Sequence, residues 1–325
     1  MKDCLQQRTD ELGSVVRDVL SGYFSRKSAE DQMPEQEALF RSKEALHLRQ
    51  EMVWNAWKLW ERQYVDGNGG NLSCRIGDQY VLCTPSMCSK ADLTLEDLCL
   101  VDLEGNQKFG RFRRTSELLL HLEIYKANAA ARAVIHCHPP HATAYAIAGQ
   151  IPPPDLVPEQ EVFVGPVAIA PYETPGTKVF AETILPFVER HNAILLANHG
   201  VVCWADTITH AEWLIEVLDT YCRTVLLALQ LGSPLRTIPH PKLQEILKIK
   251  AYLGLPDARF ESQPADSQYD FPVPLKAQTL ALSPESEIEV LVRSIAAAVR
   301  ARFGFGGTAN GNLAGPNTAE TLETR

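Results

Sequence analysis

AVIHCHPPHATA, residues 133–144, carries the most informative pattern in this 325-residue chain. The run AVIHCH predicts a buried strand, and a strand points side chains i and i+2 to the same face. His136 and His138 can therefore hold one ion from one side. A second stretch, AILLANHGVVCW (193–204), predicts two strands broken at Asn-His-Gly, which places His199 in a tight turn. Three neutral imidazoles with an open fourth position form a catalytic zinc arrangement.

Other interpretations of these histidines stay open at this level. His136 and His138 also fit two hydrogen-bonded histidines of the core. His121 and His141 lie nearby in the sequence and compete as ligands. The histidine spacing alone does not separate these alternatives.

The triplet Thr115-Ser116-Glu117 precedes a helix predicted to end at Ala129. Two hydroxyls and a carboxylate at a helix start form an N-cap, and a cap alone accounts for the pattern. The same hydroxyls, with free N–H groups at the positive helix end, can also bind phosphate oxygens. Beside a metal, Glu117 would act as an extra ligand, a general base, or both in turn.

A glycine-rich segment, Gly69-Gly70-Asn71-Leu72-Ser73, is followed by Thr84-Pro85-Ser86. Adjacent glycines let the backbone approach a ligand closely, and Asn and Ser side chains then bind phosphate oxygens without a lysine. Most segments of this composition are ordinary turns. The segment indicates a binding site only in combination with the motifs around it.

The remaining pattern predicts an α/β fold. Strands and helices intermix without strict βαβ repeats, which favours a three-layer α/β/α sandwich with a mixed, largely antiparallel central sheet. Further strands are expected at 80–84, 98–102 and 167–170, and helices after Pro34 through Trp60, at 175–191 and at 209–231.

Composition divides the chain into five parts. They are an N-terminal extension (1–34), a main domain (35–254), a Pro-rich linker (255–284), an amphipathic helix (285–303) and a tail predicted to be disordered (304–325). The extension carries an apolar stripe at helical spacing. The main domain contains every motif described above.

The charge balance limits the class of partner. There are 31 Lys+Arg against 40 Asp+Glu, a net charge of −9, which makes nucleic acid and anionic membranes unexpected partners. No signal peptide or membrane span is expected. The eight cysteines form no CxxC and predict buried thiols in a reducing compartment. We therefore expect a cytoplasmic protein.

Five blocks, in order, resemble the class II aldolase/adducin family, most closely its L-fuculose-1-phosphate aldolase branch. They are GGNLSCR, TPS before KADLTLEDL, TSE followed by LHLEIY, AVIHCHPPHATA and LLANHGVVCW. The resemblance covers about residues 45–232. It implies the α/β sandwich and a homotetramer with active sites between subunits.

The resemblance also implies the activity and the site. The reaction is reversible cleavage of a ketose 1-phosphate, L-fuculose 1-phosphate or also L-rhamnulose 1-phosphate, to dihydroxyacetone phosphate and L-lactaldehyde. One zinc per subunit is held by His136, His138 and His199, and Glu117 is the acid/base group that can also ligate the metal. The substrate phosphate is bound by Gly70, Asn71, Ser86, Thr115 and Ser116.

The chain departs from the fuculose branch at two places. Met87 stands where the family usually has glycine, so a side chain there narrows the phosphate loop or alters substrate preference. Residues 150–166 contain no tyrosine, the family's proton donor to the aldehyde; Tyr172 and Glu161 are the substitutes, unless both are structural. Lys90, the one lysine near these blocks, is expected at the surface.

These departures keep other functions open. Related zinc enzymes on the same scaffold are methylthioribulose-phosphate dehydratases and pentulose-phosphate 4-epimerases. A metal-free adducin-like interaction scaffold is a different class, which loss of the histidines would mark. Because all three histidines and Glu117 are present, the enzyme classes are favoured.

The segment 285–303 resembles the encapsulation peptides that direct enzymes into bacterial microcompartments. It follows a Pro-rich linker and carries an apolar stripe that needs a partner. Such shells enclose fucose breakdown, so a shell protein is the expected partner and the interior of a microcompartment the expected location. The alternative is a helix docked on the body or on a neighbouring subunit. The stripe within residues 5–23 is a second candidate for targeting.

Overall fold

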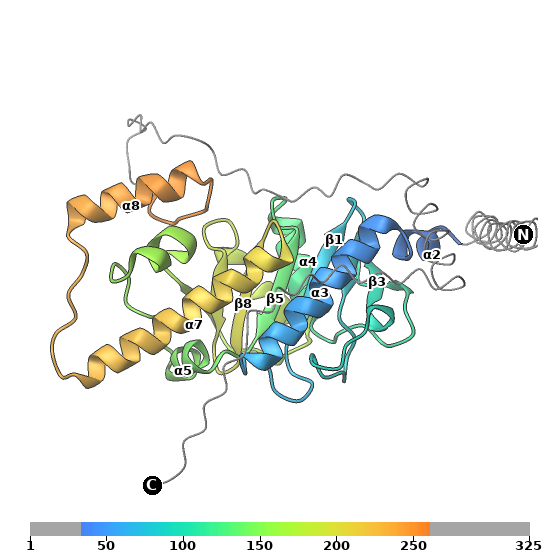
Figure 1. Cartoon of the computed structure of the whole chain (residues 1–325), viewed down its shortest axis with the longest axis horizontal. Helices are drawn as coiled ribbons and strands as arrows, with labels where there is room; N and C mark the ends of the chain where they lie inside the picture. The colour runs from blue at the N-terminus through green and yellow to red at the C-terminus, as the bar shows by residue number, and fades with distance from the viewer. Residues whose placement is uncertain (1–33, 261–325) are drawn as a thin grey trace, which may run out of the picture. The chain divides into compact units, whose positions relative to one another are not determined.

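The computed structural model describes residues 34–260, which fold around one eight-stranded sheet (Figure 1). The strand order is β4-β3-β2-β1-β5-β8-β7-β6, and all neighbours are antiparallel except β6 and β7, which are parallel. The expected α/β fold with a mixed, largely antiparallel sheet is therefore confirmed. The predictions for residues 1–33 and 261–325 lie outside the described part of the chain.

The strands match the short apolar runs of the sequence. Their bounds are β1 Asn71–Ile76, β2 Tyr80–Cys83, β3 Cys99–Asp102, β4 Gln107–Phe109, β5 Ala133–Cys137, β6 Ala168–Ala170, β7 Ala193–Leu196 and β8 Gly200–Ala205. The two central strands β5 and β8 are buried almost throughout, as their β-branched and apolar residues predict.

Helices cover both faces of the sheet. Their bounds are α2 Glu35–Phe40, α3 Lys43–Glu61, α4 Leu118–Ala127, α5 Pro140–Ala148, α6 Lys178–Glu182, α7 Ile208–Gln230 and α8 His240–Tyr252. Ile135 on β5 packs in a core with residues of α3, α5 and α7, whereas its neighbour Val134 packs in a second core with α4 and α6. Figure 1 shows α3 and α7 lying across one face. His136 shares the parity of Val134, so it faces the layer of α4.

Two predicted helices are interrupted. The helix expected after Pro34 breaks at Arg41, because Ser42 adopts an extended conformation and its side chain accepts a hydrogen bond from Ala45 N at 3.1 Å, which starts α3. The helix expected over 175–191 is reduced to α6 and a 3₁₀ turn at Leu185–Phe187. Pro186 has no N–H to continue an α-helix there.

The main body continues to Phe260. Helix α8 buries Leu243, Leu247 and Lys250, and beyond it Asp257 is also buried. No helix between residues 34 and 260 is long and apolar enough to span a bilayer. The seven cysteines in this part of the chain are free thiols, and all except Cys88 are buried.

Candidate active site

Three imidazoles converge at one end of the central strands. His136 lies on β5, His138 directly follows that strand, and His199 lies in the turn between β7 and β8. Their ligand atoms all lie within 4.8 Å of one another. Because β5 pairs with β8, with Cys137 opposite Val201, the turn before β8 reaches the end of β5. The structure thus brings together the three histidines that the sequence singles out.

Gly200 makes the close approach of the turn possible. A Cβ atom at residue 200 would lie 2.5 Å from the Cys137 carbonyl oxygen and 2.7 Å from His138 Cδ2, closer than real contacts allow. The preceding Asn198 adopts a left-handed conformation with φ 55°, which Asn tolerates better than most residues. The Asn-His-Gly triplet therefore suits a turn that presents an imidazole to β5.

The surroundings of His136 and His199 favour the neutral imidazole, the form that binds a metal. His136 Nδ1 donates a hydrogen bond to the Val201 carbonyl at 2.9 Å, which leaves the lone pair on Nε2. This Nε2 lies 3.1 Å from His138 Nε2. Burial, helped by the two neighbouring histidines, holds the pKa of His136 well below its usual range. Burial also lowers the pKa of His199, against the opposite effect of Glu117.

The donor set fits a divalent metal. In the described chain, the buried His199 Nδ1 has no hydrogen-bond partner, and one ligand atom from each of the three imidazoles lies within 4.8 Å of the other two. Imidazole suits zinc and several other transition metals, so the geometry does not select among them. Three ligands leave room for an exchangeable fourth position.

Glu117 completes this cluster. Its Oε2 lies 3.4 Å from His136 Nε2, and its Oε1 lies 3.5 Å from His199 Nε2. Glu117 is the N-cap residue of α4 and makes no side-chain cap hydrogen bond. The expected cap by hydroxyls reduces to one long contact, in which Glu117 N donates to Thr115 Oγ1 at 3.4 Å. The carboxylate is therefore free of the helix end and directed at the imidazoles.

A buried hydrogen-bond chain holds Glu117 from behind. Asn71 Nδ2 donates to Glu117 Oε2 at 2.7 Å, and the Asn71 Oδ1 accepts from His121 Nε2 at 2.6 Å. Ser73 Oγ lies 2.7 Å from His121 Nδ1 and 2.8 Å from the hydroxyl of Tyr125. Burial lowers the pKa of His121 to about 3, which keeps this imidazole neutral. His121 is therefore outside the three-histidine group and supports Glu117 through Asn71.

This chain of contacts was not foreseen from the sequence. One signal existed: His121 lies four residues after Glu117 on α4, so both side chains share one helix face. Ser73 alternates with Asn71 on β1 and faces the same side. The two periodicities together point to the contact, but only once α4 is known to lie over β1.

The residues expected to bind phosphate lie on two paired loops and the glycine turn. Thr115 N donates to the Thr84 carbonyl at 3.0 Å, and Ser86 Oγ donates to the Arg114 carbonyl at 3.1 Å, so the loops are fixed side by side. Ser116 is exposed and Thr115 is buried.

Gly70 lies at the other side of the cluster, with φ 70°. A Cβ there would lie 2.5 Å from Val65 Cγ1 and 3.0 Å from the His136 carbonyl. Only glycine fits at this position next to β5. The glycine turn is thus required by packing, and phosphate binding by these residues remains a prediction.

Met87 and Lys90, which follow Ser86 in the sequence, differ in exposure. Met87 adopts φ 59° and is 82% exposed, with Sδ 3.1 Å from Asn68 Nδ2. Lys90 was expected at the surface, and this is wrong: only 1% of it is exposed. Its ammonium donates to the carbonyls of Asn68 at 3.2 Å and of Cys88 at 3.0 Å, so the folded loops draw it inward.

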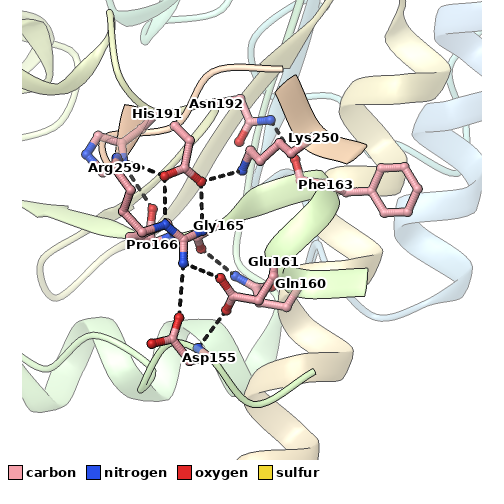
Figure 2. Close-up of polar contacts among 11 residues, drawn as sticks. Asp155, Gln160, Glu161, Phe163, Gly165, Pro166, His191, Asn192, Lys250 and Arg259 are labelled. Atoms are coloured by element: carbon pink, nitrogen blue, oxygen red, sulfur yellow. Dashed lines mark hydrogen bonds and ion pairs between the residues drawn. The ribbon is translucent and has the colours of Figure 1, made fainter. Parts of the chain in front are cut away.

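Of the two candidates for the aldehyde-side acid, Glu161 is engaged in a buried ion pair. Glu161 is fully buried, with Oε2 2.7 Å from Arg259 Nη1 and Oε1 accepting from Asp155 N at 2.7 Å (Figure 2). This ion pair ties the loop before β6 to the segment after α8, so Glu161 has a structural role. Tyr172 is 57% exposed. His141 is bonded to Asp219, 2.9 Å between Nδ1 and Oδ2, and is not in the three-histidine group.

Comparison with known proteins matches the chain to one family. Residues 50–226 match the model of the class II aldolase and adducin N-terminal domain. The chain belongs to this family. It is a metal-dependent enzyme of the class II aldolase type, with a three-histidine site that suits a divalent metal.

Three relatives show the range of the family. An L-fuculose phosphate aldolase from Methanococcus maripaludis is 37% identical over 161 residues, which are 50% of this chain and 86% of that protein. A 3-oxo-tetronate 4-phosphate decarboxylase from Haemophilus influenzae is 34% identical over 172 residues, 52% of this chain and 81% of that protein. A solved L-fuculose 1-phosphate aldolase superposes with a TM-score of 0.58 at 28% identity, covering 62% of this chain and 95% of that chain.

Proposed function

We propose that this enzyme is a metal-dependent aldolase that cleaves a ketose 1-phosphate to dihydroxyacetone phosphate and an aldehyde. L-fuculose 1-phosphate is the first candidate substrate and L-rhamnulose 1-phosphate the second. The observation that carries the proposal is the position of Glu117, whose two carboxylate oxygens lie 3.4 and 3.5 Å from two of the three clustered imidazoles.

The chemistry of the cleavage matches these groups. Breaking a carbon–carbon bond next to a carbonyl leaves negative charge on carbon and oxygen, and a divalent metal at the three imidazoles supplies the positive charge that stabilises it. The Glu117 carboxylate lies where it can accept or return the proton of that carbon or of an adjacent hydroxyl. Asn71, by donating to Oε2, keeps the carboxylate pointed at this position.

The substrate phosphate is assigned to the glycine turn and the two paired loops. The side chains proposed to bind it are Asn71, Ser86, Thr115 and Ser116, together with the backbone at Gly70. Support comes from the contact of Asn71 with Glu117, from the position of Gly70 against the His136 carbonyl and from the family to which the chain belongs. Zinc as the metal and the homotetramer are parts of the same proposal.

A decarboxylase is the second candidate. Loss of carbon dioxide from a 3-oxo acid phosphate also leaves negative charge next to a carbonyl, but it needs no acid for a departing aldehyde. The region 150–166 has no tyrosine, and Glu161 is engaged by Arg259, so no such acid is assigned. The Haemophilus influenzae relative bears this activity by name. Methylthioribulose-phosphate dehydration and pentulose-phosphate 4-epimerisation remain alternatives on the same metal site.

A paired assay separates the two main candidates. The zinc-loaded enzyme is given L-fuculose 1-phosphate in one vessel and 3-oxo-tetronate 4-phosphate in another. Dihydroxyacetone phosphate is followed with a coupled reductase, and carbon dioxide with a coupled carboxylase. The proposal expects dihydroxyacetone phosphate from the first vessel. Carbon dioxide in the second vessel, with no dihydroxyacetone phosphate in the first, would show that the enzyme is a decarboxylase and not an aldolase.

The cellular location is a separate proposal. We infer that residues 285–303 direct the enzyme to a microcompartment shell within the cytoplasm, and this inference rests on the amphipathic pattern and the Pro-rich linker alone. The enzyme with and without residues 285–325 is fused to a fluorescent protein in a shell-forming host. Puncta formed only by the full chain support the proposal, and diffuse fluorescence of both contradicts it.

A further inference from the structure

Lys90 is a buried cation wedged between two loops. Its Nζ donates to the carbonyl of Asn68, in the glycine-rich turn, and to the carbonyl of Cys88, in the loop that follows Ser86 and Met87. Only 1% of the residue is exposed. On the outer side, the two loops touch through Asn68 Nδ2 and Met87 Sδ, 3.1 Å apart.

Within the part of the chain that the structure describes, the charge of Lys90 has no counter-ion. Between residues 34 and 260, no carboxylate lies within ion-pair distance of its Nζ. An ammonium has three N–H donors, and two neutral carbonyls accept two of them. Burying a charge without an opposite charge is costly, so buried lysines are normally paired. Burial accordingly lowers the pKa of Lys90 to about 8, with only partial compensation from Cys88 and Glu117.

Lys250 provides the contrast within the same molecule. It is equally buried, but its Nζ lies 3.1 Å from Asp257 Oδ2, and this carboxylate is also bound by Arg259 (Figure 2). The fold thus pairs one buried lysine with an acidic residue and leaves the other unpaired. An unpaired buried cation calls for an anion that residues 34–260 do not supply.

The location of Lys90 indicates where that anion binds. The glycine turn whose Asn68 carbonyl holds Lys90 lies against the metal site, because a Cβ at Gly69 would lie 3.3 Å from His138 Cε1 and one at Gly70 would lie 3.0 Å from the His136 carbonyl. The two carbonyls that hold it belong to the loops assigned above to the substrate phosphate. The region where the anion would bind is therefore bordered by both loops, the metal site and the unpaired charge.

We propose that Lys90 is the fixed positive charge of the substrate's phosphate site, so that a phosphoryl dianion bound by the glycine turn and the loop at 84–88 becomes its missing counter-ion. Lys90 is in this role a positioning residue that selects phosphorylated over unphosphorylated substrates. The identity of the ligand rests on the proposed function. The existence of an anion site does not.

The test measures binding by calorimetry with the full-length, zinc-loaded protein. The variants are Lys90→Met, which keeps the length of the side chain and removes the charge, and Lys90→Gln as a second neutral form. Lys126→Met is the matched control, because Lys126 is an exposed lysine paired with Glu123. The probes are dihydroxyacetone phosphate, unphosphorylated dihydroxyacetone and inorganic phosphate.

We expect both Lys90 variants to bind dihydroxyacetone phosphate and inorganic phosphate roughly 10- to 100-fold more weakly, the range for a lost interaction with a charged group. Affinity for dihydroxyacetone should not change, and Lys126→Met should behave as wild type. Without ligand, Lys90→Met should unfold at the same temperature as wild type or a higher one, because an uncompensated charge has been removed. If Lys90 only tied the two loops together, Lys90→Met would instead unfold at a lower temperature than wild type.

The outcomes separate the two proposals. Equal affinity of wild type and Lys90→Met for both anions overturns the role of Lys90 and leaves the aldolase proposal intact. Failure of wild type to bind either anion also overturns it. Binding of inorganic phosphate that depends on Lys90, without binding of dihydroxyacetone phosphate, supports the anion site and contradicts the proposed substrate.

Discussion

Asn71→Ala tests whether the orientation of Glu117 matters for catalysis. The substitution removes the 2.7 Å hydrogen bond to Glu117 Oε2 and the 2.6 Å bond from His121 Nε2. A hydrogen bond to a charged group contributes about 1.5–3 kcal/mol. At about 1.4 kcal/mol per tenfold, we expect kcat to fall roughly 10- to 150-fold. The loss should appear in kcat, because the carboxylate acts on the reacting carbon.

The assay is the rate of product release at saturating metal, with kcat and KM measured separately. Ser73→Ala is the matched control, because it removes the 2.7 Å contact to His121 and leaves Asn71 and Glu117 bonded. Both variants leave a buried His121 nitrogen unpaired, so each should lower the unfolding temperature by about 2–10 °C. Only Asn71→Ala should lose turnover.

Three results would contradict a catalytic role for the hydrogen bond from Asn71 to Glu117. Wild-type kcat in Asn71→Ala would remove the hydrogen bond from the mechanism. An equal loss of kcat in Ser73→Ala would assign the effect to general loosening of the core. A rise in KM with kcat unchanged would restrict Asn71 to phosphate binding, the role that the family resemblance implies.

Three further perturbations test other parts of the structure. His199→Ala removes one of three clustered imidazoles and should weaken zinc binding more than roughly 100-fold in competition with a chelating dye, whereas His141→Ala should keep the metal. Arg259→Ala leaves Glu161 buried without its partner and should lower the unfolding temperature, measured by circular dichroism, by about 5–15 °C. An unchanged unfolding temperature would show that this ion pair does not stabilise the fold. Met87→Gly relieves the left-handed backbone conformation of Met87 and should raise the free energy of unfolding by up to about 1 kcal/mol in denaturant titration. Met87→Ala keeps the Cβ atom and should not stabilise the protein. Equal effects of the two substitutions would show that the backbone at Met87 is not strained.

Two parts of the histidine cluster could be predicted because local rules determine them. The alternation of side chains on β5 puts His136 and His138 on one face, and a turn containing Asn198 and Gly200 is evident from residue types alone. The mixed sheet followed from short apolar runs between helical patterns. Each of these features depends on residues close in the sequence, whereas the contact of His199 with His136 depends on the pairing of β5 with β8.

The features that were missed depend on contacts between distant segments. Lys90 is drawn inward by carbonyls of two loops, and no property of the run SKADL reveals those carbonyls. The chain from Glu117 to His121 requires α4 to lie over β1. Glu161 is removed from the list of acids by Arg259, 98 residues later. A one-dimensional pattern contains none of these distances.

The most direct test of the account is the release of dihydroxyacetone phosphate from L-fuculose 1-phosphate, with and without a chelator. We expect release by the metal-loaded enzyme, loss of release when the chelator is added, and recovery when zinc is restored. Release that persists in the chelator would contradict the role of the three histidines. Absence of release from the zinc-loaded enzyme would contradict the aldolase assignment itself.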